Sequence, residues 1–430
     1  MFSEEVSSSS RRSQDDLPTP QKFPAARNLS SIFIIGSFVT NCAGGIFPTL
    51  PQPMLQAGII AGATIIILTG AASVWSTYLI VKFVQPNSRV MLDDIISTRF
   101  PRSKKYIHFL SKSVSTLLYL SYCVFNFQLL YNQLQVLIFS RLAHWNTNYT
   151  NIIAVIITFF LSLIKNNALA VFLTGLIAVV PIVTLSGMTW YGFKNRTPES
   201  DRCFVEGWTH LSGGFLQSTR NGWYQLAQFG GVMLSAFYVQ SSMPHMLAPS
   251  KKPHHNIRNT MIGFAIVLTA YFWAAMVGSL PFACSAFDSN ATAPPSDYQT
   301  VFTHGGFAIF DQIMFLIAQL LQPPYVFMVL RSTCTDLIPW HNYRRRWRFV
   351  ADTTVNAIVC IIAVLANIYG LSIQYILDIG AVGCTIIWCV CLPVFWDMYL
   401  NRKLKDIPRH CISILCSIFL IAISIGQYCF

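Results

Sequence analysis

The chain has 430 residues, of which 53% are hydrophobic and only 11% are charged. Soluble domains carry about 25% charged residues, so this composition excludes a large soluble enzyme and predicts a polytopic membrane protein. The formal net charge of +12 does not indicate nucleic-acid binding. The Lys and Arg residues lie in short segments between apolar runs, as membrane orientation requires, and not on one amphipathic face.

The N-terminal residues 1–28 differ from the rest of the chain in being polar, with a serine run at 7–10. They lack the apolar core and small-residue cleavage pattern of a signal peptide, so we interpret them as a disordered cytosolic tail. Residues 29–430 form the predicted transmembrane domain.

Apolar runs after this tail predict eleven membrane-spanning helices, because each run is long enough to cross or nearly cross a bilayer. We place them at residues 29–50, 57–83, 107–139, 150–165, 168–192, 224–247, 259–281, 306–330, 350–369, 372–396 and 409–429. A tight turn at Tyr369-Gly370 separates the ninth span from the tenth. The predicted fold class is all-α.

The distribution of basic residues predicts a cytosolic N-terminus. With that orientation 24 of the 29 Lys and Arg residues face the cytosol and five face outside, which agrees with the positive-inside rule. The glycosylation acceptors Asn148, Asn195 and Asn290 then all fall in outside loops. With eleven spans the C-terminus is expected to be extracellular or lumenal.

Cysteine usage predicts one disulfide. Ten of the twelve cysteines lie in or beside apolar spans or cytosolic loops, where they are expected to pack as small apolar residues. Cys203 and Cys284 lie in two different outside loops, the only oxidising compartment available, and we predict that they pair. The alternative is two free thiols. No Cys or His spacing predicts a zinc site.

The first span is interrupted by Gly44-Gly45 and then by Pro48 and Pro51. Paired glycines and prolines break a helix, and broken backbone inside a membrane is tolerated only where protein buries it or a watery cavity solvates it. The interruption therefore indicates a binding site near the bilayer midplane. The alternative is a kinked helix that serves packing alone.

The sixth span mirrors the first, because it begins outside and carries Gln240, Ser241 and Pro244 toward the cytosol. This pairing predicts two halves of opposite orientation, residues 29–192 and 224–396, with 409–429 left over, as in inverted-repeat transporters. Unwound backbone at two such breaks offers amides to a carboxylate and carbonyls to an ammonium or Na⁺, so a zwitterion suits the site.

Several motifs resemble those of the amino acid/auxin permease family, nearest its sodium-coupled neutral amino acid transporter branch. They are Gly44-Gly45-Ile-Phe-Pro-Thr-Leu-Pro51 with Gln56-Ala57-Gly58, Ala236-Phe237-Tyr238-Val239 with the basic loop after it, Gln322-Pro323-Pro324-Tyr325 with Arg331, and Ile379-Gly380-Ala381. In their order these motifs cover nearly the whole chain after residue 29. The resemblance implies a LeuT-like 5+5 inverted repeat plus one C-terminal helix.

The resemblance also implies site residues. Substrate contacts are expected from Gly44, Gly45, Ile46, Phe237, Gln240 and Ser241, and coupling-ion contacts from Thr40 or Asn41 and from Gln319 and Gln322. The eighth span has Gln where the family has a hydroxyl. The resemblance therefore does not decide between Na⁺ and H⁺ as the coupling ion. Asp378 in the tenth span is a further candidate for a coupled proton, the alternative being a position at the outer interface. Asp311, near the start of the eighth span, is expected at the interface.

These observations predict a secondary active amino acid transporter, without enzymatic activity and without a cofactor besides the coupling ion. The expected partners are the substrate and the bilayer, with the protein monomeric and located in the plasma membrane or in a lysosome or endosome. The alternative function is an amino acid sensor that signals through its tail. A multi-pass acyltransferase is disfavoured, because its candidate His245 lies close to the cytosolic end of the sixth span.

Overall fold

The computed structural model describes residues 28–43, 46–83, 104–137, 147–209, 219–237, 239–286, 306–337 and 345–371, with isolated positions 411, 414, 415, 418 and 422. Helices account for most of these residues, and no strand longer than an isolated bridge occurs among them. The predictions made for Gly44, Gly45, Asn290, Asp378 and the tenth span lie outside the described residues, as does the eleventh span apart from the five isolated positions.

Helices occupy the first nine predicted spans. The first five spans correspond to α2 (Ser31–Ala43) with η1 (Phe47–Thr49) and α3 (Pro51–Ala57), α4 (Ile59–Phe83), α6 (Lys104–Leu137), α7 (Thr147–Ser162), and α8 (Asn167–Leu176) with α9 (Val179–Lys194). The next four correspond to α11 (Thr219–Ala236) with η3 (Gln240–Ser242) and α12 (Met243–Leu247), α13 (Asn256–Ser279), α14 (Gly306–Leu321) with α15 (Pro323–Leu337), and α16 (Arg345–Ile368). The all-α polytopic fold class is thereby confirmed.

The prolines of the first and sixth spans open new helical segments. Pro48 lies in the first turn of η1, Pro51 in the first turn of α3 and Pro244 in the first turn of α12. A proline is tolerated there because the amide that it lacks would be unsatisfied anyway. Gly58, with φ +92°, then separates α3 from α4, so the first span continues seven residues beyond its predicted end.

Two further spans are divided at sites that the sequence analysis did not predict. The fifth span is interrupted at Ile177 and Ala178, four and three residues before Pro181. A proline ring clashes with the carbonyl four residues earlier, which explains the position of this break. The eighth span is interrupted at Gln322, immediately before Pro323 and Pro324, because the residue that precedes a proline is disfavoured in the α-helical region.

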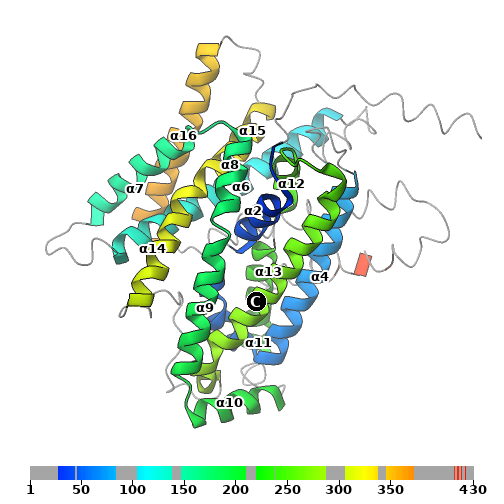
Figure 1. Ribbon diagram of the computed structural model, residues 1–430, viewed down its shortest axis with the longest axis vertical. Helices are drawn as coiled ribbons and strands as arrows, with labels where there is room; N and C mark the ends of the chain where they lie inside the picture. The colour runs from blue at the N-terminus through cyan, green and yellow to red at the C-terminus, as the bar shows by residue number, and fades with distance from the viewer. Residues whose placement is uncertain are drawn as a thin grey trace, which may run out of the picture.

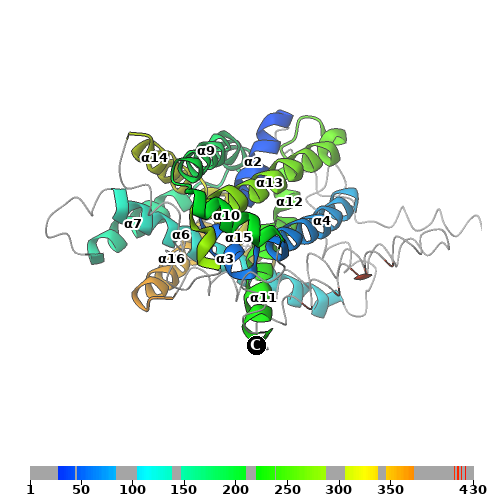
Figure 2. The same ribbon diagram turned by 90° about the horizontal axis from the view of Figure 1, so that it is seen from below.

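The described helices pack in two groups. The first helix group contains α2, α3, α4, α11, α12 and α13, and the second helix group contains α6, α7, α14, α15 and α16. The fifth span lies between them, because α8 packs on α2 while α9 packs on both α13 and α14. Figure 1 and Figure 2 show α7, α14 and α16 on one side of the molecule and α4 on the other.

The contact between α2 and α8 is a direct approach of two backbones. A Cβ added to Gly36 would lie 2.7 Å from the carbonyl oxygen of Gly175, and one added to Gly175 would lie 2.6 Å from the carbonyl oxygen of Phe33. The hydroxyls of Ser37 and Thr174 hydrogen-bond across the same contact at 2.7 Å. Small residues and interhelical hydrogen bonds of this kind hold membrane helices together.

The ninth span ends in the tight turn that the sequence predicted. Gly370 has φ +65°, and the amides of Gly370 and Leu371 donate to the carbonyls of Asn367 and Ala366. This is the hydrogen-bond pattern of a Schellman cap, which satisfies the last carbonyls of α16.

The connection after the fifth span forms a cap over one end of the bundle. Helix α10 (Pro198–Thr209) lies across that end and packs on η5 (Leu280–Ala286), which follows α13 (Figure 1). Thr197 and Ser200 cap α10 reciprocally, each side chain accepting a hydrogen bond from the other residue's amide. Cys203 and Cys284 join the two segments with a Cα–Cα separation of 5.1 Å.

We expect two cysteines of the purified protein to resist alkylation in denaturant until a reductant is added. The pair closes a sequence separation of 81 residues, so replacing Cys203 and Cys284 with serine should lower the stability to unfolding by about 2–4 kcal/mol. The measurement is mass spectrometry of alkylated protein with and without reduction. Recovery of both thiols alkylated without reductant would show that the pair does not form.

Candidate substrate site

The candidate site lies where the interruptions of the first and sixth spans meet. Helix α2 ends at Ala43 and η1 begins at Phe47, while α11 ends at Ala236 and η3 begins at Gln240. The first-span break packs on α13, the sixth-span break contacts Tyr271 of the same helix, and α3 packs on α11. The structure therefore brings together two segments nearly 200 positions apart, each with helix ends whose backbone groups lack intrahelical partners.

Tyr271 of α13 links the two breaks. Its hydroxyl lies within hydrogen-bonding distance of the carbonyl oxygen of Cys42 and 3.0 Å from that of Ala236. These are the last turns of α2 and α11. Because Tyr271 is fully buried, its hydroxyl provides the polar contact that these two carbonyls would otherwise obtain from water.

An aromatic cluster surrounds this hydroxyl. The rings of Phe47 and Phe237 pack edge-on against the ring of Tyr271, at centroid distances of 5.2 and 5.0 Å. Phe264 of α13 extends the cluster to Phe38 of α2, with their centroids 4.7 Å apart. Phe237, a predicted substrate contact, thus lies in the site, and Ile46, also predicted, is buried in the same hydrophobic core.

Side chains from the sixth span and from the eighth span form hydrogen bonds with the backbone at the sixth-span break. Gln240, a predicted substrate contact, is the first residue of η3, and its side-chain oxygen accepts a hydrogen bond from the amide of Val239 at 2.9 Å. The hydroxyl of Tyr325, on α15, donates to the carbonyl of Ser242 at 3.0 Å. Tyr325 is therefore a direct contact from the second helix group to the broken helix of the first. Ser241 lies in η3, and its side chain is outside the described part.

The first-span candidates for ion coupling lie in the last turn of α2. Asn41 donates to the carbonyl and to the hydroxyl of Ser37, at 2.7 and 3.3 Å, so its amide serves the α2–α8 contact. Thr40 is buried, and its hydroxyl has no hydrogen-bond partner among the described residues. Of the two alternatives, Thr40 is the one whose polar side-chain atom is buried without a partner among the described residues.

The eighth-span candidates flank the break between α14 and α15. Both polar atoms of the Gln319 side chain are buried without a hydrogen-bond partner in the described structure. Gln322 is buried and is itself the break residue. A buried amide without partners is costly, because each lost hydrogen bond leaves its desolvation uncompensated. No hydrogen bond joins Thr40 to Gln319.

Two tyrosines of this region were not predicted from the sequence. Tyr271 and Tyr325 occur in apolar runs with other aromatic residues, and only their contacts distinguish them from packing side chains. Asp311, for which a position at the membrane interface stays a prediction, has a fully buried side chain. It accepts a hydrogen bond from Thr184 at 2.9 Å, between α14 and α9.

The predicted glycosylation acceptors that are described lie at exposed helix ends. Asn148 is in the first turn of α7, and Asn195 follows the last residue of α9 and donates to the carbonyl of Tyr191. Both residues are exposed. Occupancy of either remains a prediction.

Comparison with solved structures identifies the fold. The chain aligns with Mhp1, a nucleobase-cation-symport-1 family transporter in a closed conformation with bromovinylhydantoin bound, at a TM-score of 0.56 and 12% identity over 95% of this chain and 93% of that one. It aligns with MhsT in complex with L-phenylalanine at a TM-score of 0.58 and 12% identity, over 92% and 98% of the two chains. No protein-family profile and no curated protein sequence matches the chain.

The broken first and sixth spans and this structural similarity define the class of the molecule. The chain is an integral, multi-pass, all-α membrane protein with the LeuT-like fold. Seven helical segments of the described part, some of them interrupted, are long and apolar enough to cross a membrane. At this level of identity the similarity establishes the fold alone.

Proposed function

We propose that the protein is a secondary active transporter that moves an amino acid across the membrane by alternating access, coupled to Na⁺ or H⁺. The observation that carries the proposal is the meeting of two interrupted helices at Tyr271. Mhp1 belongs to a family of cation symporters by its description, and MhsT is described in complex with L-phenylalanine. Cation coupling and amino acid binding therefore each have a precedent on this fold.

The chemistry of the two breaks favours an amino acid over other small molecules. The breaks offer helix N-terminal amides at η1 and η3 and C-terminal carbonyls at α2 and α11, which suit a carboxylate and an ammonium group. The aromatic cluster of Phe47, Phe237 and Tyr271 suits an apolar side chain. A neutral, apolar amino acid would fit the amides, the carbonyls and the aromatic cluster together. We also propose that the two predicted halves, residues 29–192 and 224–396, are the units that move relative to each other during alternating access.

Uptake into proteoliposomes tests the proposal. A mixed set of labelled amino acids is presented under an imposed Na⁺ gradient and then under an H⁺ gradient. We expect accumulation of neutral amino acids under one gradient, collapsing when an ionophore dissipates it. Saturable binding without accumulation under either gradient would overturn the transporter and favour the sensor.

A second experiment separates transport from sensing. Deletion of residues 1–28 should leave uptake unchanged, because the tail precedes the first helix, which begins at Ser31. A sensor that signals through its tail would lose its signal in the same variant. Loss of uptake on deletion, in protein of normal stability, would contradict the proposed division of roles.

We further propose that Thr40 and Gln319 take part in binding the coupling ion. Their buried polar atoms lack partners in the described structure, as expected of groups that an ion or its water would engage. Thr40 lies on the first span and Gln319 on the eighth, the two spans that the family resemblance implicates.

We expect Thr40→Val and Gln319→Leu to raise the ion concentration for half-maximal uptake at least about tenfold, a loss of about 1.4 kcal/mol. Neither variant removes a hydrogen bond that the described structure makes, so thermal stability should be unchanged or slightly higher. The matched control is Thr77→Val on α4, whose buried hydroxyl is likewise unpartnered among the described residues. An equal change in the control variant would indicate a packing effect and contradict the assignment.

A further inference from the structure

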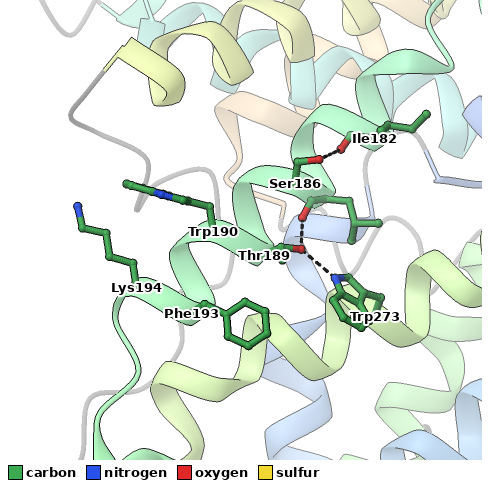
Figure 3. A pocket seen from close by; sticks show the side chains of 8 residues that line it. Ile182, Ser186, Thr189, Trp190, Phe193, Lys194 and Trp273 are labelled. Atoms are coloured by element: carbon green, nitrogen blue, oxygen red, sulfur yellow. Dashed lines mark hydrogen bonds between the residues drawn. The ribbon is translucent and has the colours of Figure 1, made fainter.

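A groove on the outside of the bundle runs between α9 and α13. It has a volume of about 700 Å³ and is lined along α9 by Ile182, Leu185, Ser186, Thr189, Trp190, Phe193 and Lys194, with Trp273 of α13 opposite. Figure 3 shows Trp273 reaching toward Thr189 across this groove. A second groove of about 560 Å³ shares Ile182, Leu185 and Trp273 and continues to Phe47.

The lining of the groove is mostly apolar, and its few polar groups are already hydrogen-bonded. The hydroxyl of Ser186 donates to the carbonyl of Ile182 at 2.8 Å, and that of Thr189 donates to the carbonyl of Leu185 at 2.7 Å. The indole N–H of Trp273 donates to the Thr189 hydroxyl at 2.8 Å. These three polar groups already have hydrogen-bond partners within the protein. The groove therefore suits a hydrocarbon chain, which needs no hydrogen bond.

The groove is open to the surrounding bilayer. Ile182 is 62% exposed, Trp190 53% and Trp273 44%, although α9 and α13 are membrane-spanning helices. Lipid is the medium that contacts such faces in a multi-pass protein. The occupant must therefore come from the membrane.

Two cations mark one end of the groove. The ammonium group of Lys194 lies over the ring of Trp190, 4.5 Å from its centroid, and the guanidinium of Arg196 lies 5.5 Å from the centroid of Phe193 (Figure 3 shows Lys194 beside Trp190). Both side chains are exposed, and neither forms an ion pair with a carboxylate of the described residues. The aromatic rings hold the two charges at the groove's mouth.

The length of the groove matches one leaflet. Ile182 and Lys194 are twelve positions apart on α9, which corresponds to about 18 Å at 1.5 Å per residue. One leaflet contributes about 15 Å of a hydrocarbon core of about 30 Å. A chain lying along the groove would thus place its headgroup at Lys194 and Arg196.

We propose that this groove is a binding site for a phospholipid with a net negative headgroup. Its acyl chain lies between α9 and α13, and its phosphate binds Lys194 and Arg196. The continuation to Phe47 brings the chain end close to the interruption of the first span, because Phe47 packs on Tyr271. A sterol would leave both cations unused, so it is the less suitable occupant.

Tryptophan quenching by brominated lipids tests the site, because Trp190 and Trp273 both line the groove. The protein is reconstituted in phosphatidylcholine with brominated phosphatidylglycerol or brominated phosphatidylcholine at equal content. We expect the anionic lipid to associate on the order of tenfold more strongly, as two basic residues near a membrane surface permit. Equal quenching by the two lipids would overturn the proposal and leave only general solvation by lipid.

Three variants test whether Lys194, Arg196 and the groove produce the preference for the anionic lipid. Lys194→Gln with Arg196→Gln should abolish the preference for the anionic lipid, whereas Arg202→Gln should retain it, because Arg202 lies on α10 and pairs with Glu206. Ser186→Phe keeps both cations but fills the groove, and it should also abolish the preference. A preference that survives in Ser186→Phe, or quenching that brominated sterol produces independently of Lys194, would overturn the site. None of these readouts depends on transport.

Discussion

A leucine at Gly175 is expected to reduce uptake at least about tenfold, because it separates α2 from α8 at their closest approach. A Cβ at this position would lie 2.6 Å from the carbonyl oxygen of Phe33 and 3.1 Å from its Cα, both of them backbone atoms that cannot rotate away. Overpacking of this kind costs about 1–3 kcal/mol, and a helix forced outward loses its remaining contacts as well. The Ser37–Thr174 hydrogen bond is one of those contacts.

The matched control is Gly306→Leu, at the start of α14, where an added Cβ meets no atom within 4 Å. Uptake and thermal stability are measured for both variants in the same lipid, together with the rate at which Cys42 reacts with a maleimide. Cys42 is buried near the end of α2, so displacement of α2 should speed its labelling. If Gly175→Leu matches Gly306→Leu in uptake, stability and labelling, the backbone contact between α2 and α8 does not exist as described.

Tyr271→Phe is expected to have the second large effect, a loss of uptake of about tenfold or more in a protein that still folds. The substitution keeps the ring and its packing against Phe47 and Phe237, and it removes only the hydroxyl. The carbonyls of Cys42 and Ala236 then lose a buried donor. A buried group left unsatisfied costs about 1–3 kcal/mol, and here both affected groups belong to the proposed substrate site.

Initial uptake rates and substrate binding are measured for Tyr271→Phe beside Tyr106→Phe, in which the replaced tyrosine is largely exposed on α6. We expect the control to behave as the unmodified protein. Tyr325→Phe, which removes the bond to the carbonyl of Ser242, should also reduce uptake, because it severs a link between the two helix groups. Normal uptake in Tyr271→Phe would show that the two breaks are not held through this hydroxyl.

The interruptions of the first and sixth spans were predictable because their causes are local. Pro48, Pro51 and Pro244 cannot donate backbone hydrogen bonds, and this holds in any environment. The same rule applies to Pro181 and Pro323, but the sequence analysis read these spans as continuous because their apolar runs are unbroken. The structure shows that a proline inside a long apolar run also divides the helix.

The candidate site was predictable only in outline. Phe237 and Gln240 were expected from the family resemblance, and both lie at the sixth-span break, but the side-chain oxygen of Gln240 accepts a hydrogen bond from the amide of Val239. Thr40 and Asn41 could not be distinguished by sequence. The structure separates them, because Asn41 bonds to Ser37 while Thr40 has no hydrogen-bond partner among the described residues.

The sequence alone determined that this is an all-α membrane protein with long apolar spans and two interrupted helices of opposite direction, since run length and proline and glycine chemistry act over a few residues. Only the tertiary structure decided that Tyr271 joins the two breaks, that Asp311 is buried against Thr184, and that Gly36 meets Gly175. The physical reason is distance along the chain. Each of these contacts joins residues 35 or more positions apart, and such pairs meet only after the helices have packed.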